Sequence, residues 1–370
     1  MSQNTKIPFH VPSINDKEIE AITNVLDSGW LTTGKITKEF EKYFAQFVGA
    51  KYASAVSSAT AGLFLSLKAI GINDESTVIT TPYTFVSTAE VVEWIGADLM
   101  FVDVEDDYNI SAKKILHSYN VGVDIDAIIP VHIGGYEFDL SKISNLNIPI
   151  IEDSAHNLPS IFSEQSKTAV FSFYATKPLT TGEGGMVVTN DEEIYKNIES
   201  LKFHGISTNA WNRYTDNKWY YEVDKLGYKF NLTDLASAIG IQQLSKQFLF
   251  ASQRRNIANR YLNELYNVKA INFPKHYLSE LANNNWHLFM IQVDPKDRDK
   301  IFQKLTDKGI GASVHFIPLH MMPYYRNKYN YSSEDFPKAK ELFEKSISIP
   351  IYPDMTEEQI NYVIYTLTNI

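Results

Sequence analysis

The chain of 370 residues contains no cysteine. Disulfide bonds, thiolate nucleophiles and cysteine-ligated zinc or iron–sulfur centres are therefore excluded. Long apolar runs are also missing, since nothing approaches the ~18 consecutive apolar residues of a membrane-spanning helix. The first residues, "MSQNTKIPFHVPSIND", lack the apolar stretch of a secretion signal. We therefore expect a cytoplasmic protein that has no membrane partner.

The chain also has fewer positively charged than negatively charged residues. The 34 lysines and arginines are outnumbered by 44 aspartates and glutamates, so the net charge is −10 at pH 7. No nucleic-acid partner is expected, because binding the phosphate backbone needs a basic face. The hydrophobic share of 44% is that of an ordinary globular protein. Since domains usually have ~100–200 residues, the length predicts two domains.

Strand-length apolar segments alternate with helical patterns over residues 52–190. "YASAV" (Tyr52–Val56) predicts a strand, and the pattern that follows predicts a helix to Gly71. "TVITTPY", "LMFVDV", "DAIIPVHI" and "IPIIEDS" are nearly continuous apolar runs, as in a mostly parallel sheet covered on both faces. "TAVFSFYA" and "GMVVTN" predict two more strands, paired around the turn after Lys177. The whole pattern indicates a large α/β domain.

Helices and a smaller domain are predicted on either side of this region. Amphipathic helices are expected at Ile14–Val25 and Thr37–Phe47, and one or two long helices at Thr233–Tyr266. Further on, "NWHLFMIQVD" and "RDKIFQKLTDKGIGASVHF" predict a strand, a helix and another strand. We therefore expect a large domain over residues 1–245 and a small C-terminal α+β domain over residues 246–370.

Three segments place unusual residues where strands of the predicted sheet end, which is where such sheets bind ligands. "IPIIEDSAH" contains Asp153, "FSFYATK" ends in Lys177, and "YASAVSSATAG" leads into a helix through small hydroxyl residues. Each has an ordinary explanation by itself, as a helix cap or a solvated lysine. Taken together, a carboxylate, an amine and a helix N-terminus that can bind phosphate are what pyridoxal 5′-phosphate requires.

Other cofactor and metal sites are not indicated. Neither G-x-G-x-x-G nor the full Walker motif G-x-x-x-x-G-K-[ST] is present, since Ile36 follows "GWLTTGK"; this argues against a dinucleotide oxidoreductase and against a Walker loop. The spacing of His204, His315 and His320 does not suit a compact ligand set, and no H-E-x-x-H motif accompanies them. We therefore expect no metal site, and a structural or substrate-contact role for these histidines.

The segments that suggest this cofactor also carry a family resemblance. "SSATAG", "EDSAH" and "FSFYATKPLTTGEGG" resemble the signature segments of the DegT/DnrJ/EryC1/StrS family of PLP-dependent nucleotide-sugar aminotransferases. "SLKFHGI", "GYKFNLTDLASAIG", "VHFIPLH" and "PDMT" extend the likeness over essentially the whole chain. It is greatest to members that aminate C4 of a 4-keto sugar, such as the UDP-4-keto-pentose aminotransferase of lipid A modification.

The resemblance implies a fold type I transferase that forms a homodimer with shared active sites. It implies L-glutamate as amino donor and a nucleotide-linked keto sugar as acceptor, for surface polysaccharide or glycolipid biosynthesis. The "TTGEGG" turn is more like the C4 group than the C3 group. Amination at C3 and a PLP-binding regulatory protein without turnover remain as alternatives.

The resemblance also implies roles for single residues. Lys177 would form the imine with the cofactor and later move the proton, and Asp153 would pair with the pyridine nitrogen. His156 would lie beside the ring, and Phe85 would stack on it. Four residues would hold the phosphate, the last of them from the neighbouring subunit: Ala59, Thr60, Ser172 and Asn231.

Substrate contacts are implied less specifically. The loop "GWLTTG" and the acid of "GEGG" would lie near the sugar nucleotide, although a tight turn and a surface acid explain them equally well. The candidate substrate residues are Leu31, Thr32, Glu183, Arg213, His315 and His320. Tyr174 and Pro178 stand where many C4-aminating relatives have histidine and asparagine. We expect these two departures to affect the choice of sugar and to leave the catalytic groups intact.

Overall fold

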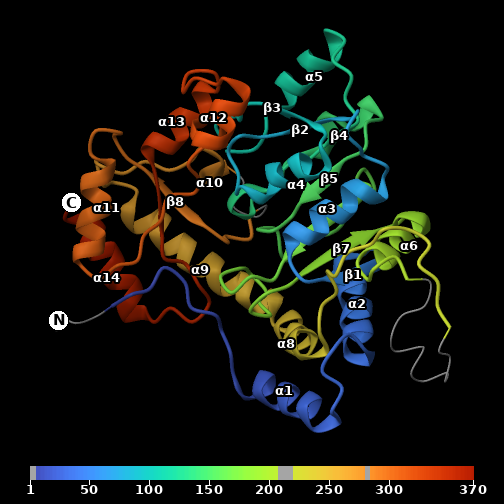
Figure 1. The fold of residues 1–370 in the computed structure, drawn as a ribbon. Coiled ribbons are helices and arrows are strands. Elements are labelled where there is room, and N and C mark those ends of the chain that lie inside the picture. The colour runs from blue at the N-terminus through green and yellow to red at the C-terminus, as the bar shows by residue number, and fades with distance from the viewer. Residues whose placement is uncertain (1–5, 207–219, 280–283) are drawn as a thin grey trace.

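The computed structural model describes residues 6–206, 220–279 and 284–370 of the chain (Figure 1). Its centre is a sheet in the order β3-β2-β4-β5-β6-β7-β1, in which single parallel bridges at Ile128–Ile150 and Val131–Asp153 join β4 to β5. The strands are β1 (Tyr52–Val56), β2 (Thr77–Thr80), β3 (Asp98–Phe101), β4 (Ala127–Ile128), β5 (Ile151–Asp153), β6 (Thr168–Ser172) and β7 (Gly185–Thr189).

Most neighbouring strands of this sheet run parallel. β2 is parallel to β3 and β4, β5 is parallel to β6, and β7 is antiparallel to both β6 and β1. The predicted mostly parallel sheet, and the pairing of β6 with β7 around the turn after Lys177, are confirmed. β4 is shorter than "DAIIPVHI" predicted, because Pro130 has no backbone N–H with which to continue the ladder.

The predicted helices are present, and others cover the sheet (Figure 1). The predicted helix over Thr233–Tyr266 is two helices, α8 and α9. The helices are α1 (Asp16–Ser28), α2 (Lys35–Val48), α3 (Ala59–Ala69), α4 (Ser87–Ile95), α5 (Ala112–Asn120), α6 (Glu192–Leu201), α8 (Asp234–Ser245), α9 (Gln247–Leu265), α10 (His276–Ser279), α11 (Arg298–Asp307), α12 (Pro323–Tyr329), α13 (Pro337–Lys345) and α14 (Glu357–Thr368). Short 3₁₀ turns lie at Ile133–Gly135, Leu140–Lys142, Ser144–Leu146 and Leu319–Met321.

Alternate residues of the strands face two helical layers, as the two-residue period of a strand requires. Val170 and Val187 belong to a core shared with α3, α4 and α6. Their neighbours Phe171 and Met186 belong to a second core on the opposite face, where α2 and α8 pack. Because both faces are covered, the carboxyl ends of the parallel strands remain as the open edge at which a ligand can bind.

The N-terminus of α2 is capped from a distant part of the chain. Gly34 precedes this helix and has no capping side chain of its own. The carboxylate of Asp234, at the start of α8, instead accepts hydrogen bonds from Gly34 N at 2.7 Å and Thr37 N at 2.9 Å. This satisfies N–H groups that have no partner within the helix, and it ties the "GWLTTG" loop to α8.

The C-terminal region has a core of its own. β8 (Phe289–Gln292) and β9 (Ser346–Ile349) form an antiparallel pair, and their buried side chains pack with α9, α11 and α14. Ile7 joins this core, because its backbone pairs with Gly309 at 2.8 Å and with Gly311 at 2.7 Å. The boundary between residues 245 and 246 stays a prediction.

The last strand predicted for this region is wrong. "GASVHF" forms a single bridge, between Ser313 and Ser348 of β9. Beyond that bridge the chain turns towards the large sheet, where the Tyr83 hydroxyl donates to His315 O at 2.6 Å. The pairing ends because these residues contact the loop after β2 instead. Among the described residues, no helix is long and apolar enough to cross a membrane.

Candidate active site

A cavity of about 510 Å³ lies beyond the carboxyl ends of β1, β2, β5 and β6. β7 runs in the opposite direction, so its amino end borders the same cavity through Gly184. Most of the site residues predicted from the sequence line it: Ala59, Thr60, Phe85, Asp153, His156, Ser172, Lys177, Glu183 and His315. The sheet order thus brings together segments that are far apart in the sequence.

Lys177 reaches the cavity from the turn that joins β6 to β7. Its backbone N–H donates to Tyr174 O at 2.9 Å, and Gly182 closes the same turn with a φ of +83°, which glycine adopts readily. Burial lowers the pKa of the Lys177 amine from 10.5 to about 8, against the opposing attraction of Asp153. A share of the amine is therefore neutral near physiological pH, and only the neutral amine is a nucleophile and a base.

Asp153 ends β5 and is buried at the floor of the cavity. Its Oδ2 accepts the Thr88 hydroxyl at 2.8 Å, and its Oδ1 accepts Ala155 N at 3.1 Å. Burial raises the pKa of this carboxyl, while these hydrogen bonds and the charge of Lys177 oppose the rise. A buried carboxylate is stabilised by a cation, so this position suits a positively charged ring nitrogen.

His156 lies one turn beyond Asp153, with its imidazole in a fixed orientation. Gly134 N donates to His156 Nδ1 at 3.2 Å, so Nδ1 carries no proton and the neutral ring is protonated at Nε2. Burial and the charge of Lys177 hold the pKa of His156 well below its usual range. Its ring stacks on Phe316, with centroids 6.0 Å apart. His156 therefore offers a flat neutral surface and one N–H donor.

The N-terminus of α3 forms an anion cradle at one end of the cavity. Ser58 caps the helix by accepting Ala61 N at 3.1 Å, which leaves the preceding N–H groups, at Ala59 and Thr60, without a partner inside the helix. Gly185 allows β7 to pack beneath them, since a Cβ there would lie 2.7 Å from Ala59 N. Free N–H groups and the helix dipole favour a phosphate at this position.

Comparison with known proteins decides the family. A family model described as the DegT/DnrJ/EryC1/StrS aminotransferase family matches residues 12–368. The chain belongs to this family.

Individual members of the DegT/DnrJ/EryC1/StrS family match over the full length. The chain is 40% identical to the spore coat polysaccharide biosynthesis protein SpsC of Bacillus subtilis, covering 100% of this chain and 98% of that protein. The putative sugar aminotransferase Spr1654 from Streptococcus pneumoniae, in its PMP-form, matches with a TM-score of 0.90 at 28% identity over 98% of both chains. Helicobacter pylori PseC, an aminotransferase involved in the biosynthesis of pseudoaminic acid, matches with a TM-score of 0.89 at 26% identity over 99% of both chains.

The predicted family, fold class and enzyme class are thereby confirmed, and the protein is a PLP-dependent aminotransferase. The chemistry of the residues that line the cavity also fits this cofactor. The amine of Lys177, the buried carboxylate of Asp153 and the N–H donors of the α3 N-terminus are groups that could hold its carbonyl carbon, its ring nitrogen and its phosphate. These three groups come from the ends of different strands and line one cavity.

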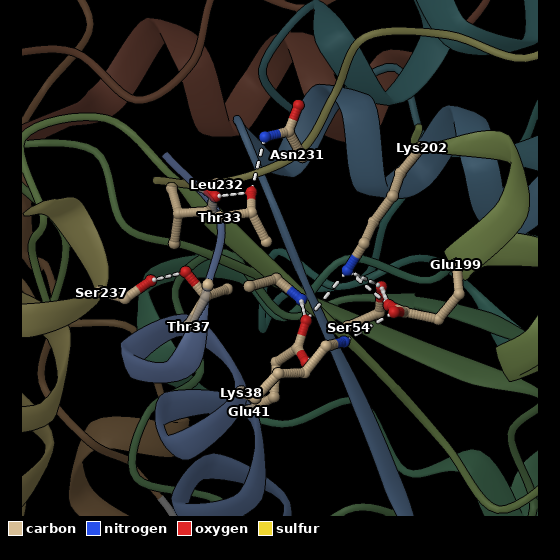
Figure 2. A network of polar contacts seen from close by, with 12 residues as sticks. Thr33, Thr37, Lys38, Glu41, Ser54, Glu199, Lys202, Asn231, Leu232 and Ser237 are labelled. Carbon is tan, nitrogen blue, oxygen red and sulfur yellow. Dashed lines mark hydrogen bonds and ion pairs between the residues drawn. The ribbon is translucent and has the colours of Figure 1, made fainter. Parts of the chain in front are cut away.

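Some predicted residues lie outside this cavity. Asn231 Nδ2 donates to the Thr33 hydroxyl at 2.6 Å, beside the "GWLTTG" loop that contains Leu31 and Thr32 (Figure 2). His320 packs against Phe336 in the interior. Arg213 lies outside the described residues. The roles predicted for these residues stay predictions.

Several cavity residues were not predicted from the sequence, namely Phe9, His10, Thr84, His287 and Phe316. Phe9 stacks on His315 with centroids 5.4 Å apart, and the His287 ring lies 4.4 Å from that of His156. Burial lowers the pKa of His10 to about 4 and that of His315 to about 3, so both are neutral at physiological pH. Phe316 lies within "VHFIPLH", but no segment that carries the family resemblance contains the other four positions. In the residues that the structure covers, no three His, Cys, Asp or Glu side chains are placed to hold a metal ion.

Proposed function

We propose that this aminotransferase moves an amino group from L-glutamate to C4 of a nucleotide-linked keto sugar, for a surface polysaccharide or glycolipid. The observation that carries the proposal is the joint position of Lys177, Asp153 and the α3 N-terminus around one cavity. A sugar substrate is supported by the names of Spr1654 and PseC, and polysaccharide synthesis by that of SpsC.

Lys177 is the group that holds and moves the proton. Bound pyridoxal 5′-phosphate supplies a carbon that combines with amines and a ring that takes up electrons. With its pKa lowered to about 8 by burial, Lys177 Nζ can accept a proton from the substrate carbon and return it at neutral pH. The part-buried position of the Lys177 side chain limits competition from water.

Asp153 and His156 orient the cofactor and control its charge. The Asp153 carboxylate would hold the ring nitrogen in its protonated form, which favours uptake of electrons by the ring. His156 would present its Nε2 proton to a cofactor oxygen, because Nδ1 is occupied by Gly134 N. Since its ring is neutral, His156 would not compete with the ring nitrogen for the carboxylate of Asp153.

The phosphate and the sugar nucleotide would be held by both subunits of a homodimer. Ala59, Thr60 and Ser172 line the cavity of their own chain, whereas Asn231 lies outside it. Asn231 would therefore serve the neighbouring active site. The likeness of the "TTGEGG" turn to C4-aminating enzymes supports C4 as the position, and its Glu183 borders the cavity.

Visible absorption of the purified protein with pyridoxal 5′-phosphate tests the proposal. The wild type should bind the cofactor with a visible band that L-glutamate bleaches and a nucleotide-linked 4-keto sugar restores. Lys177→Ala should lose this cycle and reduce turnover at least about a thousandfold. Lys196→Ala, at an exposed lysine that pairs with Glu192, is the matched control and should behave as wild type.

Each result has a definite meaning. Restoration of the band by a 3-keto sugar but not by a 4-keto sugar would move the proposal to C3. Binding of the cofactor without any response to amine donors would contradict transamination and favour a regulatory protein. A Lys177→Ala variant with wild-type turnover would contradict the role given to Lys177.

A further inference from the structure

Two threonine hydroxyls form a chain behind Asp153 that the proposed function does not use. The Thr84 and Thr88 hydroxyl oxygens are 2.9 Å apart, and Thr88 Oγ1 donates to Asp153 Oδ2 at 2.8 Å. Both threonines are buried, with 2% and 0% of their surface exposed. Thr84 also lines the cavity, so the chain runs from the cavity wall to the carboxylate.

The direction of these hydrogen bonds follows from the number of protons. An ionised carboxylate can only accept, and each hydroxyl has one proton to donate. While Asp153 is ionised, Thr88 must use its proton on Asp153, and Thr84 must then donate to Thr88. The Thr84 oxygen can consequently offer only lone pairs to the cavity. If Asp153 were protonated, its carboxyl could also donate, and the direction of these two hydrogen bonds would no longer be fixed.

We propose that Thr84 and Thr88 are positioning residues that hold Asp153 ionised and aimed into the cavity. A hydrogen bond to the charged form of a carboxyl favours that form, and bonds to charged groups are among the strongest in proteins. Ala155 N anchors the other oxygen, so both ends of the carboxylate are held. The inference rests on the proposed pairing of Asp153 with the cofactor ring.

The other charged and titratable groups around Asp153 do not replace this hydrogen bond. Lys177 faces it from the turn after β6, and the charge of His132 acts on it from the segment between β4 and the turn Ile133–Gly135. His156, on the segment after β5, lines the same cavity in its neutral form. Among these groups, Lys177 must lose its charge in order to react, so the hydroxyl of Thr88 supports the carboxylate when Lys177 is neutral.

The test measures equilibrium binding of pyridoxal 5′-phosphate to the apo-protein, by quenching of its intrinsic fluorescence, from pH 6 to pH 9. Thr88→Val removes the hydroxyl and keeps the shape of the side chain. We expect about tenfold weaker binding, with the acid limb of the affinity profile moved to higher pH. Thr88→Ser should restore both. Thr84→Val should give a smaller change in the same direction, since Thr88 still donates to Asp153.

Thr80→Val is the matched control, because Thr80 is equally buried and its hydroxyl donates to Ile129 O at 2.8 Å, away from the cavity. It should lose stability without changing the affinity or its pH profile. Wild-type affinity and pH profile in folded Thr88→Val would overturn the inference. If Thr88→Val does not fold, an unchanged profile in Thr84→Val would do so.

Asp153→Asn separates this inference from the proposed function. A large loss of affinity in Asp153→Asn together with wild-type binding in Thr88→Val would reject the role given to the threonines. It would leave the proposed pairing of Asp153 with the cofactor standing. Wild-type binding in Asp153→Asn would instead reject the pairing of Asp153 with the cofactor, and the threonine inference with it.

Discussion

At the scale of single residues, the environment of Lys177 decides its chemistry. A lysine on the surface is almost fully protonated at neutral pH and cannot act as a base. Burial opposes the charged form of Lys177 and outweighs the attraction of Asp153, so its pKa falls to about 8. The same desolvation that makes the amine reactive must reduce the stability of the apo-protein.

We predict that Lys177→Met stabilises the apo-protein near neutral pH. The amine has a pKa of about 8 when folded and 10.5 in its usual state, so the unfolded chain binds more protons between these values. Wild-type stability should therefore rise with pH over this window, relative to the variant. We expect the variant to be about 1–3 kcal/mol more stable at pH 7, with a gap that closes towards pH 10.5. Urea unfolding at several pH values measures it, and a gap independent of pH would contradict it.

At the scale of secondary-structure elements, a buried ionic cluster joins α2, β1 and α6 (Figure 2). Lys202 Nζ lies 2.9 Å from Glu41 Oε1 and 2.9 Å from the Ser54 hydroxyl, and it also pairs with Glu199. Burial would raise the pKa of Glu199, but Lys202 and Lys38 hold it at about 2. Each charge in this cluster has a partner, so the loss of one leaves others buried and uncompensated.

We predict that Lys202→Met destabilises the protein by about 3–5 kcal/mol, because it removes the buried one of the two cations that Glu41 and Glu199 share and leaves them only the more exposed Lys38. Lys340→Met is the matched control, since Lys340 pairs with Glu334 on the surface. It should change the free energy of unfolding by less than about 1 kcal/mol. Chemical denaturation of both variants measures the difference. Equal effects would mean that the buried cluster contributes no more than a surface pair.

At the scale of the whole molecule, one chain does not bring all the predicted site residues together. The cavity contains the other predicted cofactor residues, whereas Asn231 and the "GWLTTG" loop do not line it and are joined to each other by a hydrogen bond. The hydroxyl of Thr33 joins the two, since it donates to Leu232 O and accepts from Asn231 (Figure 2). This arrangement suits a surface that completes the site of a second copy.

Mixed dimers test the shared site. Lys177→Ala and Asn231→Ala should each be nearly inactive alone. Because a hybrid dimer has one site with both residues intact, random exchange of equal amounts should restore about a quarter of wild-type activity. Mixing each variant with itself is the control. No recovery, although subunit exchange is confirmed by mass, would mean that Asn231 acts within its own chain.

Local features of the sequence were enough for much of the fold. Tyr52–Val56 is a strand as predicted, and α1 and α2 follow their amphipathic patterns, because burial of one face imposes a period on the sequence. The helix caps show the limit of such reasoning. α1 is capped by its own Asn15, but α2 is capped by Asp234 at the start of α8, which lies 200 residues beyond Gly34 in the chain.

The candidate site divides in the same way. The sequence by itself pointed to Lys177, Asp153, His156 and the α3 N-terminus as candidates, because each lies in a short recognisable segment, and the structure places all four around one cavity. Only the tertiary structure decided that the Thr88 hydroxyl donates to Asp153 and that His10 and His287 line the cavity. The physical reason is that a motif depends on neighbours along the chain. Hydrogen bonds and cavity walls formed by distant segments depend instead on the order of the strands and on which side chains are buried when the elements pack.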